Sequence, residues 1–303
     1  MLDIFQYSFI QNALLAGCIV AVIAAITGYF LIVRGLTFAG HALPNIGFAG
    51  AAGAVLLGID PVLGLFVFTI GAGIGIGLLG REVNERDTSI GVLMTLALGL
   101  GILFLALYHG YAERAYSILF GQIVGISQSD VLITIISSVL VFAAILLLFR
   151  PLLFSSFDPE VAEARGVPVR LLSIVFLILL AIIVSLSVQI VGTLLVFTLL
   201  VGPPATAVRI AKSPLRAIVL AVVLGVCYTF LGIYLAALNG VWPVSFFIAA
   251  LSFVVYLPVR LLSPLWRERA ARKGDLDKVP SAEKKAHETT TGQTAEQIPG
   301  TFR

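Results

Sequence analysis

The sequence is poor in charged residues and in cysteine. Of its 303 residues, 12% are charged and 59% are hydrophobic, and its mean hydropathy is +1.08. One soluble core cannot bury that much apolar surface, which excludes a soluble globular domain. The two cysteines, Cys18 and Cys227, lie inside apolar runs, which excludes a disulfide framework and a zinc-finger cluster. The scarcity of charge therefore predicts an integral membrane protein.

Motifs for catalysis and for nucleotide binding are also missing. The sequence contains no HExxH, no GxSxG and no paired Asp motif, and it has three histidines in all. It has no Walker A motif (GxxxxGKS or GxxxxGKT), so any ATP hydrolysis must take place on a separate subunit. The formal charge of +3 leaves no basic groove, because eight of the nineteen Lys and Arg residues follow Pro264, among six acidic residues. We expect no enzymatic activity, no cofactor bound by this chain and no nucleic-acid partner.

Long apolar runs are what the sequence has in quantity. A helix needs about 20 apolar residues to cross the hydrocarbon layer. Nine runs approach that length, at 10–33, 39–58, 61–79, 88–108, 131–149, 171–191, 193–210, 214–238 and 241–262. The seventh contains Gly202-Pro203-Pro204, and two adjacent prolines remove two backbone donors, so we expect this span to be broken into two half-helices. The predicted fold is all-α, a polytopic membrane protein with about nine transmembrane helices, one of them broken.

Basic residues indicate how these spans are oriented, because short cytoplasmic loops retain Lys and Arg. With nine spans, ten basic residues ahead of the tail fall on one side: Arg34, Arg81, Arg86, Arg150, Arg165, Arg170, Arg209, Lys212, Arg216 and Arg260. The other side receives only Arg114. This division predicts a multi-pass protein with its N-terminus outside and its C-terminus in the cytoplasm.

A polar loop on the predicted cytoplasmic side, between Phe149 and Arg170, has the signals of a short helix. Asp158 is a suitable N-cap, Pro159 fits the first helical position, and Gly166 is a suitable C-cap. Such a helix is either a linker or a docking element for another protein.

Ionisable side chains are almost absent from the apolar runs. The acidic residues fall in loops or at the ends of runs, which leaves no buried carboxylate for a proton relay. His41 is the exception, and Thr37 and Asn45 lie four residues to either side of it. On a continuous helix these three donors share one face, unless Pro44 distorts the register. The face is either a path for a divalent cation or a hydrogen-bonded contact with a neighbouring helix.

Several stretches resemble the permeases of metal-uptake ABC importers, which are bacterial membrane subunits for zinc, manganese and related divalent metals. The similarity covers most of residues 20–262. It includes Asp87-Thr88-Ser89-Ile90-Gly91-Val92, the segment 118–127 with Gln122 where the family usually has an acidic residue, Val188-Gln189-Ile190-Val191-Gly192-Thr193, and Pro204-Ala205-Thr206-Ala207. The most specific stretch is Phe157-Asp158-Pro159-Glu160 followed by Ala162, Ala164, Gly166, Val167 and Pro168.

The resemblance implies a role and partners for that stretch. In the family, the segment 158–168 is the coupling helix that seats in a groove of the ATPase subunit. Asp158, Glu160, Ala162 and Gly166 are therefore the expected ATPase-coupling residues. The expected partners are an ABC ATPase subunit, an extracellular metal-binding solute-binding protein, a second permease copy in a homodimer, and membrane lipid.

The second span also resembles the family, and it supplies the candidate metal ligands His41, Thr37 and Asn45. Many family members have an Asp four residues before the histidine and a Gly after the proline, where this chain has Thr37 and Asn45. Imidazole suits zinc, whereas carboxylate suits manganese. We therefore expect zinc as the transported metal, with manganese second.

These observations predict the permease subunit of an ABC importer, which takes up a divalent metal through the bacterial inner membrane by alternating access. Residues 1–266 are expected to form the transmembrane permease domain. Residues 267–303, which have hardly any large apolar side chains, are expected to form a disordered cytoplasmic tail. The alternative is a secondary transporter of a small solute that works without an ATPase.

Overall fold

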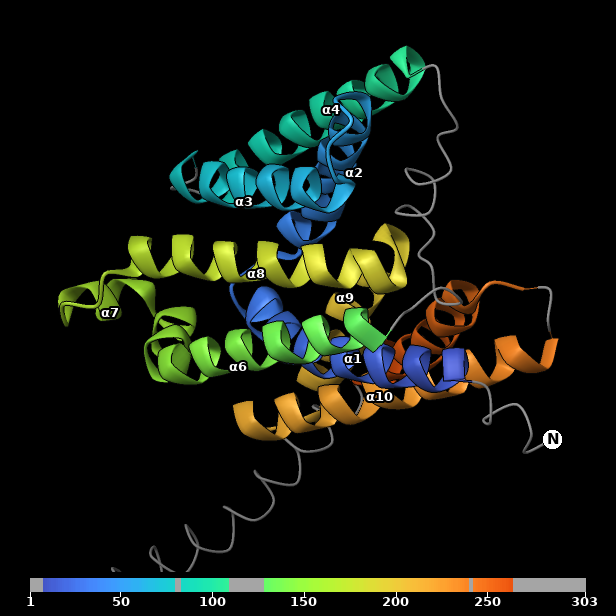
Figure 1. The fold of residues 1–303 in the computed structure, drawn as a ribbon. Coiled ribbons are helices and arrows are strands. Elements are labelled where there is room, and N and C mark those ends of the chain that lie inside the picture. The colour runs from blue at the N-terminus through green and yellow to red at the C-terminus, as the bar shows by residue number, and fades with distance from the viewer. Residues whose placement is uncertain (1–7, 80–82, 109–127, 240–241, 264–303) are drawn as a thin grey trace, which may run out of the picture. The chain divides into compact units, whose positions relative to one another are not determined.

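The computed structural model describes residues 8–79, 83–108, 128–239 and 242–263, and the regular structure of these residues is helical (Figure 1). The helices are α1 (Ser8–Val33), α2 (Thr37–Leu56), α3 (Pro61–Leu79), α4 (Val83–Leu107), α6 (Gln128–Phe157), α7 (Pro159–Ala164), α8 (Val169–Val191), α9 (Thr193–Ile210) and α10 (Pro214–Asn239), followed by Val244–Ser263. The described residues divide into two units, with the boundary between Tyr256 and Leu257. The segment 118–127 and the predicted tail, 267–303, lie outside the described residues.

Seven of the described helices are long and apolar enough to cross a membrane. They contain the stretches Ile10–Val33, Pro61–Leu78, Asp87–Leu107, Val131–Phe157, Val169–Val191, Pro214–Asn239 and Val244–Ser263. The other two predicted spans are also helical but differ from these seven. Helix α9 is the shortest of the nine spans, with 18 residues that include two prolines, and α2 is rich in Gly and contains a His, an Asn and a Pro. The all-α, polytopic membrane fold is thus confirmed.

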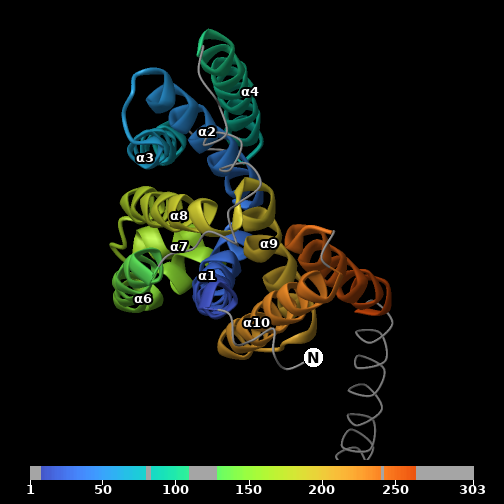
Figure 2. The ribbon, with the colours of Figure 1, turned by 45° about the vertical axis from the view of Figure 1, so that its right-hand side comes forward.

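Helix α1 lies at the centre of a group in which it contacts α6, α9 and α10 (Figures 1 and 2). A second group consists of α2, α3 and α4, in which α2 packs against both of the others. The two groups meet where α3 packs along α8 and where α2 touches α9. This arrangement places α3 against both α2 and α8.

Glycines on α3 make its two close contacts. Gly64 lies against the backbone of Gly50 in α2, and a Cβ at either position would collide with the carbonyl oxygen of the other. On the opposite side, a Cβ at Gly73 would lie 2.9 Å from the Leu177 carbonyl oxygen of α8. Such small residues let helices approach closely in lipid, where the hydrophobic effect does not hold them together. Helix α3 therefore joins α2 to α8 through backbone contacts.

Helix α9 is continuous through Pro203 and Pro204, so the predicted break in this span is wrong. Proline at 204 removes the N–H that would otherwise bond the Leu200 carbonyl. That carbonyl and the Pro204 ring lie against α1 at Gly28, where a Cβ would collide with the oxygen. Packing against neighbouring helices allows a proline-containing span to stay helical. Because Gly28 has no side chain, the Leu200 carbonyl and the Pro204 ring of α9 have space against α1.

Helix α6 is longer than the predicted span 131–149. It runs to Phe157, with Pro151 inside it, so the predicted loop begins only at Asp158. Leu152 is completely buried and holds the last turns of α6 against the core. The coupling segment therefore starts directly at the end of a rigid helix.

Threonine hydroxyls in the spans bond back to their own helices. Each of Thr27, Thr95, Thr206 and Thr229 donates to the carbonyl oxygen four residues before it, at 2.7–2.9 Å. One pair bridges two helices, because the hydroxyl oxygens of Thr69 in α3 and Ser185 in α8 are 2.6 Å apart. The hydroxyl groups of these four threonines are thus satisfied without a neighbouring helix.

Candidate functional site

The first half of α2 has one face that its neighbours do not bury. Between residues 37 and 47, the side chains that are not buried are those of Thr37, Phe38, His41 and Asn45. Pro44 does not interrupt the helix, so Thr37, His41 and Asn45 share one face as their spacing predicted. His41 is exposed, and the other two are half-buried. We call Thr37, His41 and Asn45 the polar face of α2.

Neighbouring helices contact two members of the polar face. The imidazole ring of His41 meets the ring of Phe197 in α9 edge to face, with 4.9 Å between the centroids. The side-chain nitrogen of Asn45 donates to the His41 carbonyl oxygen at 2.8 Å and lies 3.9 Å from the sulfur of Met94 in α4. Because the Asn45 nitrogen is engaged in this way, the side-chain oxygen is the atom of Asn45 that can bind a cation.

The donors on the polar face are all neutral or weakly basic: one hydroxyl, one imidazole and one amide oxygen. Within the described ranges, no three His, Cys, Asp or Glu side chains are grouped so that they could hold a metal ion. Without a carboxylate, the polar face of one chain offers too few strong ligands to hold a divalent cation tightly. The polar face is better suited to an ion in transit, or to one that other ligands also bind, than to a permanently bound ion.

The coupling segment begins with the predicted N-cap. The Asp158 carboxylate accepts a hydrogen bond from the Val161 backbone N–H at 3.0 Å, and Pro159 occupies the first helical position. The carboxylate thereby satisfies one of the N–H groups left open at the start of α7. Asp158 is thus confirmed as the cap of this helix.

The end of α7 lies one residue before the predicted position, because Arg165 is the C-cap in place of Gly166. Gly166 has a φ of 81°, a left-handed conformation that favours glycine, and its N–H donates to the Glu163 carbonyl at 2.9 Å. The next residue, Val167, donates to the Ala162 carbonyl at 3.0 Å. These two bonds turn the chain sharply from α7 towards α8, with Arg165 as the C-cap and Gly166 directly after it.

Helix α7 presents a mixed surface to its surroundings. Ala162 is completely buried and anchors the helix to the unit, while Glu160 and Glu163 are exposed and Val161 is 42% exposed. An exposed acidic and apolar face on a rigidly capped helix is suited to contact with another protein. The geometry thus fits a docking element better than a loose linker.

The structure adds Arg34, whose contacts were not predicted from the sequence. Its guanidinium donates to the Ser155 hydroxyl at 2.9 Å, to the Ser156 hydroxyl at 3.4 Å and to the Ser173 hydroxyl at 2.5 Å. It also lies over the ring of Phe176, 5.7 Å from the centroid. These partners are more than 120 residues away along the chain. The sequence signal for these contacts was the adjacent pair Ser155-Ser156, just before the segment 158–168.

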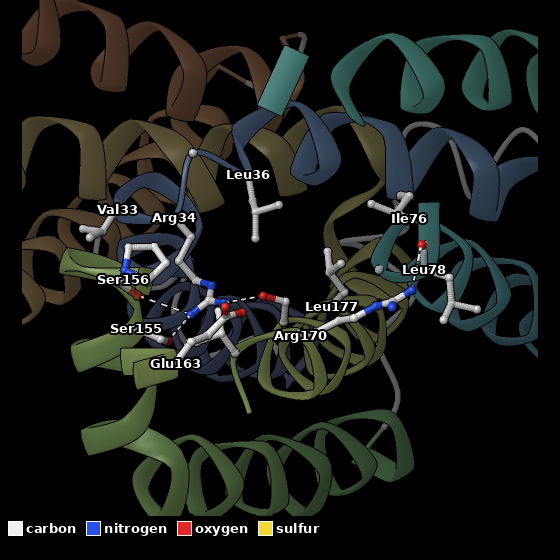
Figure 3. Close-up of a pocket in the computed structure, with 15 residues that line it drawn as sticks. Val33, Arg34, Leu36, Ile76, Leu78, Ser155, Ser156, Glu163, Arg170 and Leu177 are labelled. Carbon is white, nitrogen blue, oxygen red and sulfur yellow. Dashed lines mark hydrogen bonds between the residues drawn. The ribbon is translucent and has the colours of Figure 1, made fainter. Parts of the chain in front are cut away.

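These contacts border a cavity of about 870 Å³ at one end of the unit (Figure 3). The cavity is lined by residues from α1, α3, α6, α7 and α8 and from the turn before α2, including Arg34, Ser155, Glu163, Arg170 and Ser173. In Figure 3 the side chains of Arg34 and Glu163 point towards each other, while Arg170 extends away towards α3. The Arg170 guanidinium lies 3.5 Å from the Leu78 carbonyl oxygen.

The same contacts bring several chain segments to one end of the unit. The ends of α1, α3 and α6 and the beginnings of α2 and α8 all border the cavity. The basic residues Arg34 and Arg170, both predicted to be cytoplasmic, therefore lie at the same end as α7. This agrees with the alternating direction that the nine-span prediction gives to these helices.

Comparison with known proteins places the chain among transporters. A family profile described as the ABC 3 transport family matches residues 6–262. The manganese transport system membrane protein MntC of Listeria monocytogenes is 32% identical over 258 residues, which are 82% of this chain and 92% of that protein. The manganese import system permease protein ScaB of Streptococcus parasanguinis is 33% identical over 231 residues, 76% of this chain and 82% of that protein.

The fold is also similar to a solved structure. The structure of PsaBC from Streptococcus pneumoniae in complex with Fab aligns with a TM-score of 0.75 and 29% sequence identity. The alignment covers 85% of this chain and 92% of the other. The similarity in sequence and the similarity in fold thus extend over nearly the same part of the chain.

Proposed function

This chain belongs to the ABC 3 transport family and is the membrane permease of an ABC metal importer, and from that premise we propose that it carries Mn²⁺ into the cell along the polar face of α2. Family membership decides against a secondary carrier, the alternative that the sequence left open. The permease has no ATPase domain, so ATP hydrolysis belongs to another subunit.

The choice of manganese differs from the zinc predicted from His41 alone. The two bacterial relatives described above are both named as manganese transport proteins. The polar face supports the same choice, because it offers two oxygen donors, from Thr37 and Asn45, for one nitrogen donor from His41. Oxygen ligands suit Mn²⁺, whereas imidazole ligands suit Zn²⁺.

The uncovered polar face is the observation that carries the proposal. Every other side chain between residues 37 and 47 is buried except Phe38, so only this face of α2 is left for an ion or for another chain. Because the face is incomplete as a metal site, we propose that a second copy of the permease brings its own α2 alongside, in a homodimer. The ion path then runs between the two copies.

The remaining parts of the proposal concern the membrane and the other subunits. Nine helices cross the bacterial inner membrane, with α2 and α9 lined by neighbouring protein, the N-terminus outside and the C-terminus inside. The capped helix α7 seats in a groove of the ATPase subunit and uses Glu160 and Val161 as contacts. An extracellular solute-binding protein delivers the ion to the opposite end of the permease.

Metal content of cells tests the choice of cargo. In a strain that lacks this gene, growth in medium limited for both metals should lower cellular manganese, and the wild-type gene on a plasmid should restore it. Cellular zinc, measured by mass spectrometry on the same samples, should stay constant. Restoration of zinc but not of manganese would contradict the proposal and return the assignment to the metal expected from His41.

A further inference from the structure

We propose that Arg34 is the positioning residue through which movement of the coupling helix α7 reaches the polar face of α2. This inference rests on the proposed function, because it requires that α7 docks the ATPase and that α2 carries the ion. It assigns no contact with the metal to Arg34. The guanidinium is the point where the segments before and after α7 are tied to the turn that begins α2.

One tie joins Arg34 to the end of α6, immediately before α7. The guanidinium donates to the hydroxyls of Ser155 and Ser156, at 2.9 and 3.4 Å. Both serine hydroxyls donate their own protons to the Leu152 carbonyl oxygen, so their lone pairs face Arg34. Ser156 is two residues before Asp158, the N-cap of α7. A displacement of α7 should therefore also displace the two serine hydroxyls that Arg34 binds.

The second tie joins Arg34 to the beginning of α8, immediately after α7. The other guanidinium nitrogen donates to the Ser173 hydroxyl at 2.5 Å, and the guanidinium lies over the Phe176 ring. Phe176 is completely buried, so this part of α8 does not move independently of the core. The planar group thus bridges the two helices that flank α7.

The link from Arg34 to α2 is short and rigid. Only Gly35 and Leu36 separate Arg34 from Thr37, the first residue of α2 and of the polar face. The turn is closed by hydrogen bonds from the Gly35 N–H to the Ile32 carbonyl at 3.0 Å and from the Leu36 N–H to the Leu31 carbonyl at 2.8 Å. A displacement of the guanidinium therefore reaches Thr37 through three residues of constrained backbone.

The chemistry of the link requires arginine. A guanidinium has donors on two nitrogens in a fixed plane, so it can hold α6 with one edge and α8 with the other while its face rests on an aromatic ring. A lysine ammonium has the same charge, but it cannot span both helices with a rigid fork. The cavity of about 870 Å³ beside Arg34 gives the flanking segments space in which to shift.

The ratio of Mn²⁺ transported to ATP hydrolysed tests this role. The whole transporter, with its ATPase subunit, is reconstituted in liposomes and supplied with the solute-binding protein loaded with Mn²⁺. Coupling between two sites typically changes an equilibrium by about 5–150-fold. We expect Arg34→Ala to assemble with the ATPase and hydrolyse ATP, with a transport ratio roughly tenfold below the wild-type value, and Arg34→Lys to fall between them.

Two further sets of variants separate a link from a general structural role. Arg170→Ala removes a second guanidinium from the same cavity, and its ratio should match wild type because the Arg170 guanidinium donates to the Leu78 carbonyl of α3 and does not connect α6 to α8 through the described serine hydroxyls. Ser173→Ala and the double variant Ser155→Ala/Ser156→Ala each cut one tie and keep Arg34. Each should lower the ratio less than Arg34→Ala does.

The outcomes distinguish this inference from the proposed function. If wild-type liposomes hydrolyse ATP but take up no Mn²⁺, the proposed cargo is wrong and the role of Arg34 falls with it. If the wild type transports Mn²⁺ and Arg34→Ala keeps the same ratio, only the role of Arg34 is overturned. The role of Arg34 is also overturned if Arg34→Ala no longer assembles with the ATPase. It is likewise overturned if Arg170→Ala lowers the transport ratio as much as Arg34→Ala does.

Discussion

The carbonyl oxygen of Leu200 in α9 occupies the place where a side chain on Gly28 of α1 would begin. Pro204, which cannot donate a hydrogen bond to that oxygen, has its ring against the same glycine. The backbones of α1 and α9 are therefore in direct contact at this point. A chain that keeps two prolines within a span depends on this contact for a continuous helix.

Replacing Gly28 by alanine should destabilise the protein by about 1–3 kcal/mol, the usual cost of adding atoms to a well-packed site. Gly75→Ala in α3 is the matched control, because nothing lies within 4 Å of a Cβ at that position. Both substitutions replace a helical glycine by alanine and raise helix propensity equally. The difference in stability between the two variants therefore reports the packing at Gly28. Thermal unfolding midpoints in one detergent should fall for Gly28→Ala only, and equal midpoints would contradict the close contact of α1 with α9.

Helix α7 should lose its docking function when its end cannot form. Gly166→Pro is incompatible with a φ of 81° and removes the N–H that bonds the Glu163 carbonyl. The variant should reach the membrane but fail to co-purify with the ATPase subunit. Gly166→Asn is the matched control, since asparagine tolerates the left-handed conformation, and it should keep most of the binding.

Reversal of one charge tests the exposed face of the same helix. Glu160→Arg leaves the caps of α7 intact and changes only an exposed side chain. If this face contacts the ATPase, co-purification or stimulated ATP hydrolysis should be lost, because like or unpaired charges at an interface oppose binding. Normal binding by both Glu160→Arg and Gly166→Pro would reduce α7 to a linker.

We expect His41 to be required for uptake because it binds the metal, and not only because it packs against Phe197. His41→Ala is expected to lower Mn²⁺ uptake sharply while expression and ATPase binding persist, because the polar face loses its one nitrogen donor. Thr37→Asp should favour Mn²⁺ over Zn²⁺ further, since it adds a carboxylate. The informative variant is His41→Gln, which can still form hydrogen bonds. Uptake by His41→Gln at the wild-type level would sink the ligand assignment.

The orientation of the permease can be measured with single cysteines. In a background with Cys18 and Cys227 replaced by serine, a cysteine at Leu57, which is 74% exposed after α2, should react with an impermeant reagent from outside. A cysteine at Val161 in α7 should react only from the cytoplasmic side. Labelling of both positions from the same side of intact cells would refute the direction assigned to α2 and α7.

Much of the fold follows from local features of the sequence. The apolar runs predicted the long described helices, and the short helix α7 followed from Asp158, Pro159 and Gly166 to within one residue. The spacing of Thr37, His41 and Asn45 likewise predicted their common face. All of these depend on residues close together along the chain, so periodicity and capping chemistry are sufficient to predict them.

The features that were missed depend on distant segments. Pro203-Pro204 predicted a break, but whether a proline-containing span stays helical is decided by its neighbour, here Gly28 of α1. Arg34 counted in the sequence only as one cytoplasmic charge, since nothing near it indicates that Ser155 and Ser173 will surround it. The expectation of zinc rested on the imidazole of His41, whereas the relatives described above are named as manganese transport proteins.

The threonine hydroxyls that donate to carbonyls in their own helices bear on how the protein is made. A span whose polar groups are already paired can leave the insertion machinery and enter lipid alone, without waiting for a later helix to supply a partner. The hydroxyl groups of Thr27, Thr95, Thr206 and Thr229, in α1, α4, α9 and α10, need no partner from another helix. Helix α2 differs, because its polar face is met by Phe197 of α9 and Met94 of α4, which are both synthesised after it. The polar face of α2 therefore reaches its final surroundings only after α9 has been made.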